Sequence, residues 1–333
     1  MECAANKEMY AKAFSGCNFD VKKVRKIKVE KPKEDGLLEI ISAYETFLHD
    51  TEQVFHQVAY YERALDTLKG TGYNPKGINR FLEHICNDDI ADLDGIFISA
   101  LVNRIIKDND VITLNPKKAL YSYLGYAHPK GTLVIEGDAT NHLAVCMQGG
   151  AIMLKGNAGD SAGEYMRGGL LKIRGNAADF LGEHMDGGKI MVKGNVGYSV
   201  GTEMDNGTII VGKNAKDWAG DDMGGGLLVI KGKAGDRVGE CLLGGKIIIY
   251  GNAGCRTGAG MNGGEIIIKG NTTFGLGENL SGGKITVYGN VSTLIGHSMT
   301  GGKIVIRGKA KSLGECFSGE VWVSGKRVFK GKD

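Results

Sequence analysis

Acidic residues recur along the sequence at one constant interval or at multiples of it. One row consists of Asp160, Asp179, Asp217 and Asp236, and a second of Glu164, Glu183, Asp221, Glu240 and Glu278. Paired carboxylates of this kind can bind a cation or act as general acid and base. Both rows follow the repeat of the chain, whereas a catalytic site should interrupt it locally. We therefore expect solvated or partner-facing rows, with a cation site or catalysis as the alternatives.

Other residues that could do chemistry do not gather in the sequence. The seven cysteines are scattered without a CxxC pair, so neither a disulfide framework nor an iron–sulfur cluster is expected. GxGxxG-like strings arise from the repeat itself and not from a strand–helix turn, which leaves a dinucleotide site unsupported. The sequence therefore predicts no catalytic residue, no cofactor and no metal on this chain.

The net charge and the hydropathy of the sequence limit the cellular locations and the kinds of partner that can be expected. The net charge is only +3, the N-terminus lacks the apolar run of a signal peptide, and no stretch approaches 18 uninterrupted apolar residues. We expect a cytoplasmic protein without a membrane partner. A basic stripe could follow a polyanion, but it alternates with tyrosines and lies beside the acidic rows, so no nucleic-acid partner is expected. The stripe consists of Lys155, Arg174, Lys193, Lys231, Lys269 and Arg307.

These rows belong to a glycine-rich repeat with a period of nineteen. Its units begin at positions 132, 151, 170, 189, 208, 227, 246, 265 and 284, and a tenth, from Lys303, is one residue shorter. Positions 2 and 4 of every unit are aliphatic, and alternation at period two is typical of a strand with one buried face. One such strand cannot bury its face alone, so the copies must stack. The repeat predicts a mainly β fold, a right-handed parallel β-helix of about ten coils over residues 132–333.

The remaining repeated positions suit the corners and the interior of a coil. Glycines at positions 6, 13, 18 and 19 are expected to supply the positive φ angles of tight corners. Position 16 is Met or Leu in nine copies, then Phe317 after the deletion, and should fill the core. Asparagine at position 7 should form a ladder of amides between coils. This ladder comprises Asn157, Asn176, Asn195, Asn214, Asn252, Asn271 and Asn290.

Position 3 should point outward, yet several copies carry an aliphatic residue there. Ile210, Val229, Ile248 and Ile267 would form an apolar ridge that a soluble monomer should not leave bare. Either the N-terminal helices of the chain or another polypeptide should cover it. The ridge, aided by the neighbouring Tyr250 and Tyr288, is the candidate interface.

The part of the chain before the repeat, residues 1–131, divides into three segments. Residues 1–36 form a basic arm, with most of its charge between Val21 and Lys33. Residues 37–109 form a helical region, with helical spacing over 37–69 and further helices expected at 75–86 and 90–107. Residues 110–131 form a strand, Asp110–Leu114, and a connection into the rod. The region is expected to cap the open end of the β-helix.

The repeat IxVxGNAGDxxGxxMxGG resembles the β-helical domain that ends the large subunit of glutamate synthase. It is also similar to the glycine-rich β-helical subunit of formylmethanofuran dehydrogenase, an enzyme of one-carbon metabolism. The first coil, in which Ala144 replaces the glycine of position 13, looks more like the stand-alone archaeal-type subunit of glutamate synthase. Regular copies such as GNAADFLGEHMDGG (175–188) look at least as much like the dehydrogenase subunit. The matching segment covers roughly residues 100–320.

The resemblance implies a non-catalytic structural subunit of a multi-subunit oxidoreductase. Flavin, iron–sulfur, molybdopterin or metal chemistry would then lie on other subunits, which are the expected partners. Two alternatives come from other classes of protein. Other β-helices are self-standing hydrolases of esters or polysaccharides, and a self-associating rod would be a homo-oligomeric assembly module.

Overall fold

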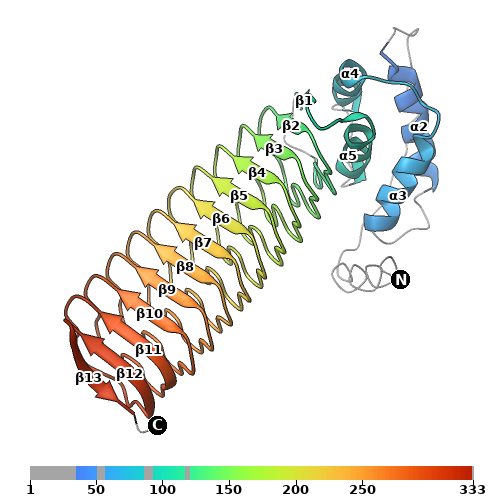
Figure 1. Ribbon diagram of the computed structural model, residues 1–333. Helices are drawn as coiled ribbons and strands as arrows, with labels where there is room; N and C mark the ends of the chain where they lie inside the picture. Colours follow the sequence, from blue (N-terminus) through green and yellow to red (C-terminus); the bar gives the residue numbers. More distant parts are fainter. Residues whose placement is uncertain (1–34, 51–56, 86–92, 117–120, 332–333) are drawn as a thin grey trace.

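The computed structural model describes residues 35–50, 57–85, 93–116 and 121–331. The chain forms a long rod, with one strand of each coil along one side, and four helices gathered at one end (Figure 1). Thirteen strands form one sheet in sequence order, and all neighbouring pairs are parallel except the last. The parallel β-helix predicted from the repeat is confirmed, with about eleven turns.

The strands are short and evenly placed along the rod. They are β1 (Val111–Leu114), β2 (Thr132–Ile135), β3 (Ala151–Leu154), β4 (Leu170–Ile173), β5 (Lys189–Val192), β6 (Thr208–Val211), β7 (Leu227–Ile230), β8 (Lys246–Ile249), β9 (Glu265–Ile268), β10 (Lys284–Val287), β11 (Thr300–Ile306), β12 (Ser318–Val323) and β13 (Lys326–Lys330). The eleventh turn is the segment that begins with β1, which pairs with β2 in register, Val111 opposite Thr132. Residues 111–131 are therefore part of the rod as well as the connection into it.

Neighbouring strands align so that identical repeat positions stack. Ile209 lies beside Leu228, which lies beside Ile247, and the same register holds from β2 to β11. The residues of positions 2 and 4 are buried in all ten copies, from Leu133 to Ile306. Burial of one aliphatic side chain contributes about 1.5–3 kcal/mol, and each coil provides the inner face against which the next one packs.

The glycines do not all serve the purpose expected of them. Positions 13 and 19 do have positive φ, as at Gly182 (+69°) and Gly188 (+79°). Positions 6 and 18 do not, apart from Gly137 (+114°). There glycine is needed for space, because a Cβ on Gly175 would lie 2.6 Å from the carbonyl oxygen of Gly156. Positive φ occurs instead at positions 11 and 15, on residues such as Phe180 and His184. Stacking of the coils holds the backbone of these residues in the left-handed region, which costs a non-glycine residue energy in isolation.

The C-terminal end departs from the repeat. Met147 to Met299 of position 16 are buried as predicted, but Phe317 is 58% exposed. The shortened tenth copy moves Phe317 out of the core, and Cys316 packs against the core instead. Strand β13 then turns back antiparallel to β12 and forms the free edge of the sheet. Its exposed Lys326, Arg327 and Lys330 discourage edge-to-edge pairing with another chain.

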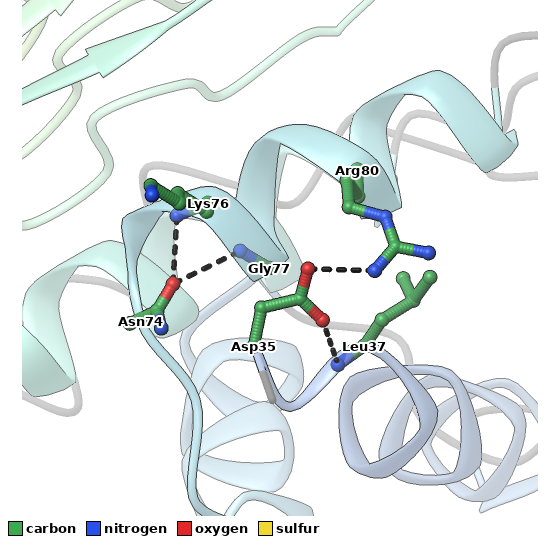
Figure 2. Close-up of polar contacts among 6 residues, drawn as sticks. All are labelled: Asp35, Leu37, Asn74, Lys76, Gly77 and Arg80. Atoms are coloured by element: carbon green, nitrogen blue, oxygen red, sulfur yellow. Dashed lines mark hydrogen bonds and ion pairs between the residues drawn. The ribbon is translucent and has the colours of Figure 1, made fainter. Parts of the chain in front are cut away.

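Four helices precede the rod in the described residues: α2 (Leu37–Asp50), α3 (Gln57–Thr67), α4 (Pro75–Ile85) and α5 (Leu93–Ile105). The helical spacing over 37–69 thus corresponds to two helices, α2 and α3. Figure 2 shows how two of the helices begin. The Asp35 carboxylate accepts a hydrogen bond from the Leu37 amide and pairs with Arg80 at 2.7 Å, while the Asn74 side chain accepts one from the Lys76 amide. The basic arm, apart from Asp35 and Gly36, lies outside the described residues.

The helices cover the first turn of the rod. Asn79 of α4 donates to the carbonyl of Thr113 (2.7 Å) and accepts from the amide of Asn115 (2.9 Å), so its side chain satisfies the edge of β1. Asn103 of α5 donates to the carbonyl of Tyr126 at 2.9 Å. The helical and β-helical cores form one continuous cluster. The N-terminal helices therefore cap this end of the rod.

Candidate functional site

The asparagine row forms hydrogen bonds between consecutive coils. The side-chain oxygen of one asparagine accepts from the backbone amide of the residue one coil further on, as from Asn271 N to Asn252 Oδ1 at 2.9 Å. Asn290 N donates to Asn271 Oδ1 in the same way at 2.7 Å, and Asp138 begins the row by accepting from Asn157 N. Direct amide-to-amide bonds are fewer and longer, 3.3 Å between Asn176 and Asn157. The row therefore supports the corner, with the side-chain oxygens engaged in hydrogen bonds from the next coil.

The aspartate row at position 10 also accepts hydrogen bonds from the backbone of the next coil, at a second corner. Asp160 Oδ1 accepts from the amide of Asp179 at 3.0 Å, and Asp236 Oδ1 accepts from the amide of Cys255 at 2.8 Å. We expected these carboxylates to be solvated or partner-facing, and the structure uses one oxygen of each to satisfy the next coil. A local side chain-to-backbone bond is the usual function of aspartate in turns.

The row at position 14 is less exposed than expected for an outer row. Glu164 is buried. The pKa of Glu183 is raised above its usual value, mainly by burial and to a smaller extent by repulsion from Glu164. Burial and the neighbouring Asp222 and Glu240 carboxylates raise the pKa of Asp221 to about 6. The acidic side of the rod therefore carries carboxylates that lack sufficient positive charge nearby.

Two histidines take part in contacts that the sequence did not reveal. The ring of His142 stacks on Tyr123 with 4.5 Å between centroids, and His184 stacks on Tyr165 at 4.8 Å. His142 Nδ1 lies 3.1 Å from Glu164, and His184 Nδ1 lies 3.4 Å from Glu203. The two rings of each stacked pair occupy the same position in consecutive coils, so the period of the repeat was the signal that could have found them.

These groups do not form a metal centre. Within the described ranges, no three His, Cys, Asp or Glu residues come together in a way that could hold a metal ion. Burial raises the pKa of the Cys146 thiol to about 12, which disfavours the thiolate that a nucleophile requires. Asp221 could exchange a proton near neutral pH, but its closest charged neighbours are further carboxylates and Arg237. The arrangement is that of a charged surface and not of a nucleophile–base pair.

The apolar ridge is continuous along the rod. Ile210, Val229, Ile248 and Ile267 are register partners in β6, β7, β8 and β9, and all four side chains are half-buried on the outer face. The described helices lie beyond the β1 end of the rod, several coils away from the ridge (Figure 1). They do not cover it.

The two tyrosines of the candidate interface extend the ridge toward the corner. Tyr250 is 57% exposed and Tyr288 is 48% exposed, one on each side of Lys269 along the rod. The ammonium of Lys269 lies 3.8 Å from the centroid of the Tyr288 ring, a cation–π contact. The ends of strands β8 to β10 therefore present aromatic and basic groups beside the aliphatic ridge.

Comparison with known proteins gives no family for this chain. No protein-family model matches it, and neither does any curated protein sequence. Among the described residues, no helix is both long enough and apolar enough to cross a membrane. The fold and the surfaces are thus the basis for a functional argument.

Proposed function

We propose that this chain is a non-catalytic structural subunit of a multi-subunit oxidoreductase, and that it binds its partner subunit through the apolar ridge. The proposal rests on the half-buried ridge on the outer face, together with the resemblance of the repeat to the glutamate synthase and formylmethanofuran dehydrogenase β-helices. The former is the closer analogue for the first coil, where Ala144 occupies the position-13 glycine site. The chemistry would then be carried by the partner.

The ridge carries this proposal because it is costly to leave in water. These four half-buried aliphatic side chains can each lose at most ~60 Å² of apolar area, which would contribute at most ~6 kcal/mol at about 25 cal/mol per Å². Translational, rotational and side-chain ordering costs offset much of that gain. The regular hydrogen-bonding of the asparagine and aspartate rows agrees with a rigid scaffold.

The test is purification of the tagged full chain from its native cells, with identification of the bound subunits and their absorption spectrum. We expect a larger partner that carries flavin, iron–sulfur or molybdopterin chromophores, while the chain purified alone shows no visible absorption. A chromophore near one equivalent on the isolated chain would contradict the proposal. Hydrolysis of an ester or polysaccharide by the isolated chain would favour the hydrolase alternative.

A further inference from the structure

Charged residues are divided between two parts of each coil. In the nine complete copies, residues 132–302, the first nine positions contain 12 Lys or Arg and three Asp or Glu. The last ten positions contain three Lys or Arg and 13 Asp or Glu. The first group comprises the strand and the corner that follows it, and the second lies in the loops that return to the next strand. The strand side of the rod is therefore basic, although the whole chain has a net charge of only +3.

The basic residues nearest the ridge lie at position 5. Positions 3 and 5 point to the same face because side chains alternate along an extended strand, and they are about 7 Å apart. Arg174, Lys193 and Lys231 are exposed, and the described carboxylates form no ion pair with them. Lys231 lies in the same coil as Val229, whereas Arg174 and Lys193 continue the row in the two coils before Ile210. We call these three residues the basic lane.

The opposite flank of the ridge differs in charge. At position 1, Glu265 lies between Lys246 and Lys284, at 2.7 Å and 3.3 Å from their ammonium groups. The interaction with both lysines holds the pKa of Glu265 below its usual value. In these three coils the row therefore holds two lysines against one glutamate, so that its positive charge is partly neutralised within the chain. The sheet face thus presents an apolar stripe with the unpaired Lys231 on one flank, where Lys193 and Arg174 continue the positive charge beyond Ile210, and with a partly ion-paired row on the other flank.

From this pattern we infer that the sheet face binds an acidic protein surface, one that offers an apolar stripe with carboxylates along one flank. The inference rests on the proposed function and specifies the chemistry of the partner. Apolar contact along Val229 and Ile248 supplies the central, water-excluding part, and the lane supplies orientation and faster association. A nucleic acid fits less well, because its charged backbone would lie across the aliphatic ridge.

Binding to defined probes tests the inference with the full chain. The probes are a labelled copolymer of glutamate and tyrosine, polyglutamate of similar length and a DNA duplex, measured by fluorescence anisotropy. The variants are Lys193→Glu/Lys231→Glu in the lane and Val229→Thr/Ile248→Thr in the ridge. The control is Lys309→Glu/Lys311→Glu, two exposed lysines of the tenth coil.

We expect the wild type to prefer the copolymer over both other probes. The lane variant should bind the copolymer about tenfold more weakly, or worse. The ridge variant should lose the preference for the copolymer over polyglutamate, because threonine keeps the shape of the strand but removes apolar surface. The control should bind as the wild type does. Circular dichroism checks that each variant is folded.

Three results would overturn the inference. These are tighter binding of the DNA duplex than of the copolymer, unchanged copolymer binding by the lane variant, and a ridge-dependent dimer of this chain that excludes the copolymer. The same lane variant separates the two proposals in native cells. If it retains the oxidoreductase subunits, the acidic-partner inference fails while the proposed function stands. If the probes bind as expected but no redox subunit accompanies the wild-type chain, the proposed function fails.

Discussion

Ile248 and Ile249 are neighbours in strand β8, yet Ile249 is fully buried inside the rod and Ile248 lies half-exposed on its outer face. The two side chains differ only in the direction in which the strand points them. They provide a matched pair for testing which face of the sheet is the core.

Replacement of Ile249 by Asp should destabilise the protein by about 4 kcal/mol or more, because it places a carboxylate in an apolar interior without a partner. The same change at Ile248 should cost only about 1 kcal/mol, because its carboxylate can reach water. Urea denaturation followed by circular dichroism measures both. Equal losses at the two sites would show that the assignment of inner and outer faces is wrong.

Replacement of Asn271 by Ala should lower stability by about 1 kcal/mol, because the amide of Asn290 loses its acceptor in the next coil. Asn271→Asp should be close to the wild type, since Asp138 already accepts from the amide of Asn157 at the start of the row. The rate of hydrogen exchange of the Asn290 amide measures directly whether its hydrogen bond to Asn271 is formed. The ladder account fails if that amide is equally protected in the alanine variant.

Asp221 should make the stability of the rod depend on pH. Its pKa is about 6 in the folded chain and near 3.8 without the fold, so the native state holds the proton more tightly. Stability is therefore greatest at low pH with respect to this group and falls as pH rises from about 4 to 6. Asp221→Asn removes that loss.

After allowance for solvent screening, the stability gained by Asp221→Asn at about pH 7 should be ~1 kcal/mol, and it should vanish near pH 3.5. The exposed Asp186, changed to Asn, is the control on the same side of the rod. Urea midpoints at the two pH values give the comparison. A gain of the same size at both would mean that ionisation of Asp221 is not its cause.

Much of the rod can be predicted from the sequence because the same two repeat positions must be buried in every coil. The aliphatic residues of positions 2 and 4 alternate at period two in all ten copies, and a strand is the only extended element with that period. The end of the rod was less predictable. Phe317 follows a one-residue deletion, and only the path of the chain shows that this side chain leaves the core.

The charged rows were harder to interpret, because a repeat position does not reveal what a side chain bonds to. Asp160 looks solvated in the sequence, yet it accepts from the amide of Asp179. Glu164 occupies an outward row but is buried beside His142. In both cases the backbone turn at the corner, with positive φ at residues such as Ser161 and Tyr165, decides the direction of the side chain.

The most direct test of the structural-subunit account is affinity purification of Val229→Lys/Ile248→Lys from native cells. Val134→Lys/Val305→Lys is the matched control, because both residues are half-buried position-3 side chains outside the ridge. The account predicts that the ridge variant loses the redox subunits while its circular-dichroism spectrum stays unchanged, and that the control retains them. Recovery of the same subunits in the same ratio with the folded ridge variant would contradict it.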